Sequence, residues 1–495
     1  MQKRISFIIA TLLLALCCNA QQKREFRGAW IQCVNGQFQG LGTEKMQQTL
    51  SYQLDELQKD GCNAIIFQVR PECDALYESK LEPWSRFLTG KQGQAPVPYW
   101  DPLQWMIDEC HRRGMELHAW INPYRAKTKV THELAASHIA ARRKDLFFEY
   151  DGLYILNPAY AANREWSCRV AGDIVRRYDI DGLHIDDYFY PYPAAGHNIP
   201  DAENFRNDSR GFSNIKDWRR DNVSLFIKQL HDTIQANKPW VKFGVSPFGI
   251  YRNKCVDPNG SETNGLSNYD DLYADILEWV EKGWIDYCVP QIYWQIGHNT
   301  ADYETLIKWW NDKAGGRPLF IGEDVERTVK YPDLKNPQQH QMEAKYRLHS
   351  EMPNVNGTVL WYAKAAVDNI GSYGTMLRSK YWRTPALQPL MPFIDDKAPA
   401  KPQKVKTQWT EKGFFLTWKA PKASSWKDEA AKYVVYKFND KEKIDIENPE
   451  KIAAITYDTS LFLPYENGKT KFVYVVTALD RMANESKAVK KKVKL

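Results

Sequence analysis

The stretch Arg113-Gly114-Met115-Glu116-Leu117-His118-Ala119-Trp120-Ile121-Asn122 joins an amphipathic helix to a short strand. The helix pattern covers residues 102–113, and the glycine that follows is the residue type that most often ends a helix. Residues 116–122 then read as a strand with a polar end. The same order of helix, glycine and strand returns around Gly61 and Gly283. This repetition predicts successive βα units and a parallel sheet.

Strand patterns of this kind recur between residues 26 and 381, with amphipathic helix patterns between them. Eight units favour a closed α/β barrel, the (β/α)₈ TIM barrel, over an open doubly wound sheet, because no glycine-rich phosphate turn follows the first strand. The predicted strands are residues 28–32, 64–70, 116–122, 182–187, 242–247, 287–294, 318–322 and 358–362. The predicted helices are residues 45–60, 102–113, 163–178, 217–236, 272–282 and 303–314.

The chain changes character after the barrel, which we assign to residues 24–384. Residues 385–397 are rich in proline and read as a linker. Residues 398–495 are all-β in pattern, with Phe415-Leu416-Thr417-Trp418, Tyr433-Val434-Val435-Tyr436 and Tyr474-Val475-Val476-Thr477 as strands. Their spacing resembles the fibronectin type III pattern, which implies a sandwich of seven strands.

Residues 1–20 carry the pattern of a secretory signal peptide, with Lys3 and Arg4, an apolar run over 5–16, and cleavage expected after Ala20. We therefore expect export to the periplasm or the cell surface. Lipid attachment at Cys17 or Cys18 is disfavoured, because the bulky Leu16 stands where such sites use a small residue. The seven later cysteines are scattered, which indicates neither a disulfide framework nor a zinc site, although a single bridge stays open.

The composition narrows the class of partner. Lys and Arg number 67 against 61 Asp and Glu, and this near balance argues against a nucleic acid. No later segment approaches about 20 uninterrupted apolar residues, so no transmembrane segment is expected in the mature chain. The 18 Trp and 27 Tyr offer flat apolar faces with polar edges, which suit sugars.

Polar residues recur at alternate positions near the ends of four predicted strands. Because alternate strand residues share a face, we expect these side chains to point together into the barrel mouth, where such barrels carry their functional groups. The residues are Gln68 with Arg70, His118 with Trp120 and Asn122, His184 with Asp186, and Gln291 with Tyr293.

Several passages resemble the glycosyl-hydrolase-like family ten proteins, a group of exported bacterial barrels. The matching passages are Arg27-Gly28-Ala29-Trp30, Phe67-Gln68-Val69-Arg70-Pro71, Asp74-Ala75-Leu76-Tyr77, Pro83-Trp84-Ser85, residues 114–125, Asp181-Gly182-Leu183-His184-Ile185-Asp186-Asp187-Tyr188 and Pro290-Gln291-Ile292-Tyr293-Trp294. The resemblance spans the whole barrel and implies a glycoside hydrolase.

Glycosidic cleavage uses two carboxyl groups, one as proton donor and one as nucleophile or base. Asp186 is the first candidate, since its passage also resembles the fourth strand of alpha-glycosidase barrels, where an Asp is the nucleophile and Arg stands at the position of His184. Asp187 points away if the strand continues and joins Asp186 if the chain bends. Asp74 and Glu323 are further candidates for the partner, whereas Glu72 and Asp324 read as helix caps or surface charges.

Substrate binding requires hydrogen-bonding groups and stacking planes near these carboxyl groups. The candidates are Arg70, His118, Asn122, Tyr124, Arg125, His184, Gln291, Tyr293, Trp294 and Trp361.

Two other functions remain open from the sequence. A metal-dependent hydrolase could gather His118, His184 and Asp186, but the first strand lacks paired histidines and no His-Glu-x-x-His run occurs, so we expect no metal and no cofactor. A non-catalytic carbohydrate-binding protein is the second alternative. For the enzyme, a cell-wall glycan such as peptidoglycan strands is the first expectation, and a dietary or host polysaccharide the second.

Overall fold

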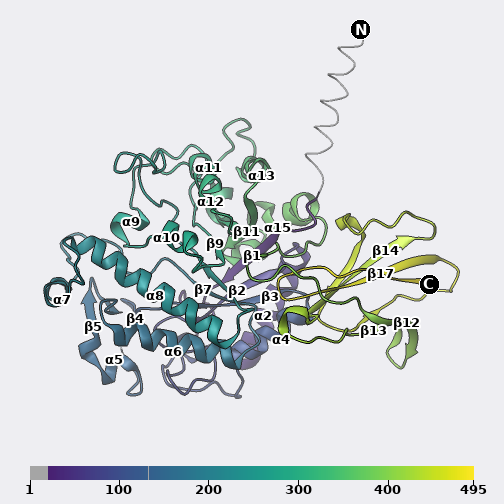
Figure 1. The fold of residues 1–495 in the computed structure, drawn as a ribbon, viewed down its shortest axis with the longest axis horizontal. Helices are drawn as coiled ribbons and strands as arrows, with labels where there is room; N and C mark the ends of the chain where they lie inside the picture. The colour runs from purple at the N-terminus through teal and green to yellow at the C-terminus, as the bar shows by residue number, and fades with distance from the viewer. Residues whose placement is uncertain (1–20, 132) are drawn as a thin grey trace, which may run out of the picture.

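The computed structural model describes residues 21–131 and 133–495, so the predicted signal peptide lies outside the described residues. Eight parallel strands close into a barrel in the order β1-β11-β10-β9-β8-β7-β3-β2 (Figure 1). The (β/α)₈ prediction is therefore confirmed. The barrel strands are β1 (Phe26–Ile31), β2 (Ala64–Arg70), β3 (Glu116–Ile121), β7 (Gly182–Ile185), β8 (Lys242–Val245), β9 (Tyr287–Cys288), β10 (Leu319–Asp324) and β11 (Val355–Trp361).

Helices surround the barrel and cover the outward face of each strand. Gly61 and Gly114, which follow two of them, have φ values of 95° and 75°, the left-handed conformation expected of a glycine at a helix end. The longer helices are α2 (Thr43–Lys59), α4 (Pro102–Arg112), α6 (Ala161–Arg177), α8 (Ile215–Asn237), α11 (Tyr303–Lys313) and α13 (Met342–Glu351). Shorter ones are α3 (Arg86–Thr89), α5 (Ile139–Arg142), α7 (Ala202–Asn207), α9 (Asn268–Asp271), α10 (Ile276–Glu281), α12 (Val325–Lys330), α14 (Ala363–Val367) and α15 (Tyr373–Met376).

The structure differs from the predicted elements in several places. The strand predicted over 287–294 is only β9, two residues long. The helix predicted over 272–282 is only α10, since Asp275 caps it by accepting a hydrogen bond from the backbone N–H of Glu278. A small antiparallel sheet of β4 (Arg125–Lys127), β5 (Phe147–Tyr150) and β6 (Leu153–Leu156) follows β3, and the sequence patterns did not indicate it.

Two hydrophobic clusters divide the barrel into an inside and an outside. The inner cluster fills the barrel, and the outer one lies between strands and helices. Alternate residues of a strand separate accordingly: Phe320 belongs to the inner cluster and Ile321 to the outer. The buried inner residues are Phe26, Trp30, Ala64, Ile66, Trp120, Tyr287, Phe320 and Val359 from the barrel strands, with Val289 directly after β9.

The C-terminal part is a sandwich of two antiparallel sheets, drawn in yellow and green tones beside the barrel in Figure 1. Side chains of both sheets, such as Trp418 and Tyr433, share one core. The resemblance to fibronectin type III stays a prediction. One sheet holds β12 (Gln403–Thr410), β13 (Gly413–Lys419) and β16 (Ser460–Phe462), and the other β14 (Lys432–Asn439), β15 (Ile452–Thr456), β17 (Lys471–Leu479) and β18 (Val489–Lys494).

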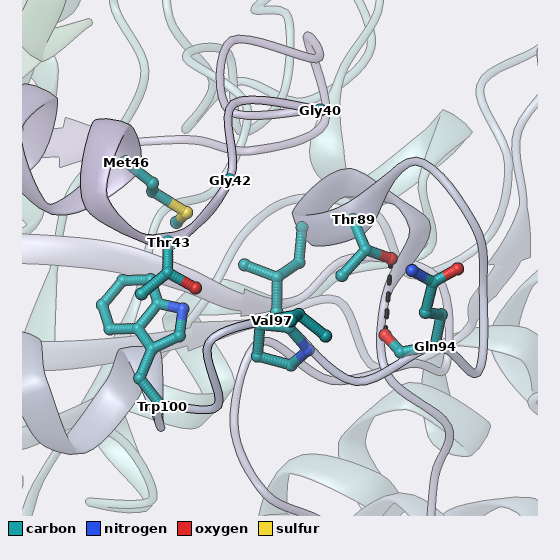
Figure 2. A pocket seen from close by; sticks show the side chains of 10 residues that line it. Gly40, Gly42, Thr43, Met46, Thr89, Gln94, Val97 and Trp100 are labelled. Carbon is teal, nitrogen blue, oxygen red and sulfur yellow. Dashed lines mark hydrogen bonds between the residues drawn. The ribbon is translucent and has the colours of Figure 1, made fainter.

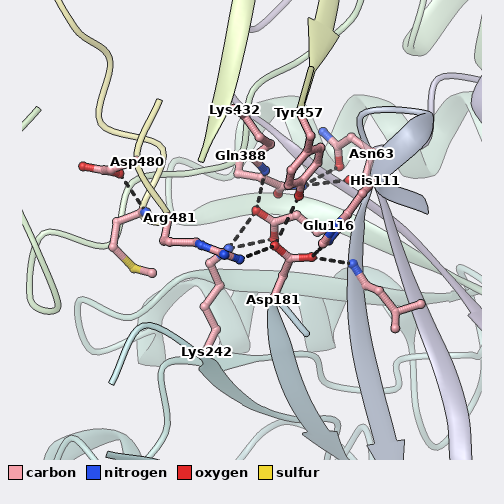
Figure 3. Close-up of polar contacts among 12 residues, drawn as sticks. Asn63, His111, Glu116, Asp181, Lys242, Gln388, Lys432, Tyr457, Asp480 and Arg481 are labelled. Carbon is pink, nitrogen blue, oxygen red and sulfur yellow. Dashed lines mark hydrogen bonds and ion pairs between the residues drawn. The ribbon is translucent and has the colours of Figure 1, made fainter. Parts of the chain in front are cut away.

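The sandwich packs against the N-terminal ends of the barrel strands (Figure 3). Lys432 Nζ donates to Glu116 Oε1 at 2.8 Å, and the Tyr457 hydroxyl donates to Asp181 Oδ1 at 3.2 Å. Residues 385–397 do not form a free tether, because Gln388 Nε2 donates to the Asn63 carbonyl at 3.0 Å and Met391 joins the inner cluster of the barrel. The barrel is thus closed at this end by the linker and the sandwich.

Among residues 21–131 and 133–495, no helix is both long and apolar enough to cross a membrane.

Candidate active site

Asp186 lies at the mouth of the barrel, directly after β7 ends at Ile185. Its Oδ2 accepts a hydrogen bond of 2.5 Å from Asn122 Nδ2, at the end of β3. The Asn122 amide is itself held, because its Oδ1 accepts from Gln68 Nε2 at 2.7 Å and from Arg125 Nη2 at 2.8 Å. These contacts fix which amide atom faces Asp186, so three strand ends position one carboxylate.

The surroundings of Asp186 shift the pKa of its carboxyl group in opposite directions. Burial, which leaves the residue 5% exposed, raises the pKa of its carboxyl group, whereas the Arg125 cation and the hydrogen bonds from the Tyr188 N–H and Asn122 favour the charged form. A carboxylate with a cation and fixed donors beside it is suited to act on a developing positive charge.

Asp187 lies beside Asp186 and is not turned away from it, because the strand stops at Ile185 and the alternation of faces stops with it. The Tyr192 hydroxyl donates to Asp187 Oδ2. Burial and the neighbouring Asp186 charge raise the pKa of Asp187 to about 7. The group can therefore carry a proton near neutral pH.

An aromatic wall stands next to the two carboxyl groups. Tyr293 and Trp361 lie nearly parallel, with ring centroids 6.1 Å apart, and both are only partly buried. Trp294 packs edge-on against Phe248 at 5.4 Å. Gln291 is partly buried and donates from Nε2 to the Ser246 carbonyl at 2.8 Å. The predicted residues Asn122, Arg125, Gln291, Tyr293, Trp294 and Trp361 thus gather near the C-terminal strand ends.

His118 and His184 point into the barrel interior, and neither is exposed. Both rings contact the Tyr287 hydroxyl, at 2.7 Å from His118 Nδ1 and 3.1 Å from His184 Nδ1. His184 lies directly beneath the mouth and His118 one layer further down, where its Nε2 is 3.2 Å from Glu116. Only His184 is therefore close to the carboxyl groups.

Arg70 and Tyr124 lie outside the barrel mouth. The pairing of β2 with β3 shifts between Gln68 and Arg70, which breaks the alternation that predicted a shared face. Arg70 is fully buried and donates two hydrogen bonds, of 2.5 and 2.7 Å, to the Glu82 carboxylate. Tyr124 is also fully buried and packs on Phe226 of α8 at 5.1 Å. Both side chains therefore make buried structural contacts and do not line the barrel mouth.

Asp74 and Glu323 are not brought together with Asp186. Asp74 accepts from the Glu72 N–H at 3.1 Å and from Gln92 Nε2 at 2.9 Å, inside the loop after β2. Burial and then the Glu72 charge raise the pKa of Asp74 to about 7. Glu323 is on the helix side of β10, where Lys345 Nζ of α13 donates to it at 2.7 Å.

Asp324 shares the inward parity of Phe320 on β10, and it also caps α12 by accepting from the Arg327 N–H at 2.8 Å. A helix cap is one of the two roles that the sequence predicted for Asp324. The sequence placed Gln68 at the barrel mouth but did not predict that it holds Asn122. It missed Ser246, which accepts from Gln291, and Tyr192, which donates to Asp187. Strand alternation could identify Ser246, but nothing in the sequence signals that Tyr192 folds back onto Asp187.

A separate cavity of about 190 Å³ lies between the loops after β1 and β2, where Figure 2 shows Thr43, Val97 and Trp100. Its lining includes none of the candidate catalytic residues. Within the described parts of the chain, no group of three or more His, Cys, Asp or Glu side chains could hold a metal ion.

The chain is similar to several known proteins. The sequence model of the family described as Glycosyl hydrolase-like 10 matches residues 25–340. The chain is 37% identical to "Glycosyl hydrolase YngK" of Bacillus subtilis over 505 residues, covering 99% of this chain and 98% of that protein. It is 38% identical to "Glycosyl hydrolase DigH" of Escherichia coli over 332 residues, covering 64% of this chain and 75% of that protein.

Among solved structures, the catalytic domain of a beta-amylase from Paenibacillus polymyxa has a TM-score of 0.48 at 11% identity, over 71% of this chain and 95% of that one. The family match and the two relatives carry the conclusion. The chain is a glycoside hydrolase that belongs to the Glycosyl hydrolase-like 10 family.

Proposed function

We propose that the protein cleaves the glycan strands of a bacterial cell wall, with Asp187 as proton donor and Asp186 as the charged partner. The observation that carries this proposal is that two adjacent carboxyl groups at the barrel mouth have different environments. Asp187 has a pKa raised to about 7. Asp186 has Arg125 and Asn122 beside it.

The proposal assigns a group to each step of the reaction. The protonated Asp187 gives its proton to the glycosidic oxygen as the bond to the anomeric carbon breaks. Asp186 stays ionised and either deprotonates a water that attacks the anomeric carbon or attacks that carbon directly, in which case a water deprotonated by Asp187 hydrolyses the resulting glycosyl ester. The Asn122 amide, held by Gln68 and Arg125, keeps the Asp186 carboxylate in one orientation during the step.

The substrate class rests on the chemistry of the mouth together with the predicted export signal. Trp361, Tyr293 and Trp294 supply the ring faces on which sugars stack. Arg125 is a cation beside the carboxyl groups, with its guanidinium 5.0 Å from the Tyr188 ring. A cell-wall strand from which the stem peptides have been removed carries free lactyl carboxylates that such a cation can pair with, whereas a neutral polysaccharide does not.

Three substrates test the proposal: purified cell-wall glycan strands, chitin oligosaccharides and a neutral mannan. New reducing ends, measured by mass spectrometry, are expected from the cell-wall strands. Chitin shares the acetamido groups but lacks the lactyl carboxylate, so its slower cleavage would support a role for Arg125. Cleavage of mannan alone would overturn the substrate class while leaving the glycoside hydrolase intact.

A further inference from the structure

A chain of hydrogen bonds crosses the barrel interior from the mouth to the sandwich. At the mouth, Ser246 Oγ lies 2.9 Å from His184 Nε2, and Trp30 Nε1 lies 3.4 Å from the same nitrogen. His184 Nδ1 is 3.1 Å from the Tyr287 hydroxyl, which is 2.7 Å from His118 Nδ1. The upper half of the chain therefore links two histidines through one phenol.

The lower half ends on a buried carboxylate that both parts of the protein neutralise. His118 Nε2 is 3.2 Å from Glu116 Oε2. Lys242 of the barrel donates to Glu116 at 2.7 and 2.8 Å, and Lys432 of the sandwich donates at 2.8 Å (Figure 3). Burial alone would raise the pKa of Glu116, but the two ammonium groups hold it well below its ordinary value.

Because Glu116 is ionised, each hydrogen bond in this chain of hydrogen bonds has a fixed donor and a fixed acceptor. A carboxylate only accepts, so His118 donates to it from Nε2, and the neutral ring accepts from the Tyr287 hydroxyl at Nδ1. The Tyr287 oxygen then accepts from His184 Nδ1–H. His184 Nε2 is left as an acceptor for the hydroxyl of Ser246 and for the Trp30 N–H. Burial lowers the pKa of both histidines, which keeps the two rings neutral.

The barrel makes room for this chain with two glycines. A Cβ atom on Gly182 would lie 2.4 Å from His118 Nδ1, and one on Gly244 would lie 1.9 Å from the Tyr287 ring. Both glycines face inward on β7 and β8, so any other residue would displace a ring. The interior is thus shaped around His118 and Tyr287.

We propose that Glu116, His118 and Tyr287 are positioning residues that fix the tautomer of His184 beneath the catalytic carboxyl groups. Asp186 follows the end of β7, two residues after His184, and Ser246 follows β8 beside it, since the Ser246 N–H donates to the Ile185 carbonyl at 2.9 Å. With His184 Nε2 as acceptor, the Ser246 hydroxyl is directed to His184, and the Ser246 carbonyl accepts from Gln291 Nε2 at 2.8 Å at the mouth. The inference rests on the proposed role of Asp186.

The first test is the tautomer of His184 in the unmodified protein. In a sample labelled with ¹⁵N at histidine, the assigned His184 signals are expected to show a proton on Nδ1 and none on Nε2 at neutral pH. Assignment uses the signals lost in His184→Gln. An Nε2–H tautomer, or a charged ring, would overturn the proposal, and this result does not depend on any substrate.

The second test breaks the chain at its middle. Tyr287→Phe keeps the ring but removes the hydroxyl, and Tyr303→Phe is its matched control, because the buried Tyr303 hydroxyl also contacts a histidine, His349 Nε2, at 2.6 Å outside the barrel wall. We expect Tyr287→Phe to lower kcat about 10-fold or more with little change in KM, since a misplacement of about 1 Å can cost about 10²-fold.

Tyr303→Phe is expected to keep its kcat even where its melting temperature falls. Equal kcat values in the two variants would show that the chain only packs the core, and would overturn the proposal. If Tyr287→Phe does not fold, the tautomer measurement decides alone. A parent protein that cleaves no tested glycan contradicts the proposed substrate, and the ¹⁵N spectrum still reports on the chain.

Discussion

Asp186 and Asp187 are neighbours in the chain, yet their carboxyl groups meet different surroundings. Burial raises the pKa of Asp186, while Arg125 and the Asn122 amide beside it oppose that rise by favouring the charged form. Asp187 faces the Tyr192 hydroxyl and the negative charge of Asp186, and its pKa is raised to about 7. Such a separation of environments is how two carboxyl groups divide the roles of acid and charged partner.

The pH dependence of catalysis follows from Asp187. The donor must be protonated, so kcat/KM is expected to fall as the pH rises through about 7, where Asp187 loses its proton. Asp187→Asn removes the titrating group, and the variant should be slow and should lack this fall. A parent profile that stays flat from pH 6 to pH 9 would contradict the role of Asp187.

Single residues near the mouth were predictable where they follow the end of a strand closely. Residue spacing brought Asp186 to the mouth directly after β7, and Gln291 and Tyr293 after β9, although both strands end before these residues. Asp187 could not be placed in this way, because its direction depends on where the strand stops. Tyr192 reaches Asp187 from a loop, and its contact depends on a tertiary path that no local pattern encodes.

At the scale of elements, the shift between β2 and β3 separates Gln68 from Arg70. Gln68 holds Asn122 at the proposed catalytic site, whereas Arg70 holds Glu82 and the Asn122 and Pro123 carbonyls together. The register shift thus places Gln68 at the candidate site and Arg70 in a buried structural network. The sequence cannot show such a shift, since it adds no signal to the apolar pattern of the strand.

Arg70→Met tests this division. Removing the guanidinium leaves Glu82 buried without its cation, and breaking such a pair costs about 3–5 kcal/mol of the free energy of unfolding. We expect a large loss in denaturant melts, with KM unchanged in the fraction that stays folded. A variant of normal stability with a raised KM would instead place Arg70 among the substrate-binding residues.

At the scale of the whole molecule, the sandwich is a part of the barrel's closed end. Lys432 meets Glu116 there, and Arg481 donates to Asp179 at 2.8 Å. The change from helix-and-strand to all-β patterns located this second unit in the sequence. The contact between the sandwich and the barrel was not predictable. The charged residues that form it are scattered along the sequence, and each resembles an ordinary surface charge.

Lys432→Met measures how much that contact contributes. Lys242 still neutralises Glu116, so we expect the free energy of unfolding of the barrel to fall by up to about 3 kcal/mol, the lower end for a broken buried pair. Lys308→Met is the control, because its pair with Glu304 lies on the surface and should cost less than about 1 kcal/mol. Equal losses of unfolding free energy in the two variants would show that the buried Lys432–Glu116 pair stabilises the protein no more than a surface pair does.

The most direct test of the mechanism is the turnover of Asp186→Asn on a glycan that the parent cleaves. The substitution keeps the size of the side chain and removes its charge, so the account predicts a folded protein whose kcat falls by at least about 10²- to 10⁴-fold. Asp74→Asn, at a buried carboxyl group held by Gln92 in the loop after β2, should retain most of the parent's kcat. Near-parental turnover in Asp186→Asn would contradict the central claim.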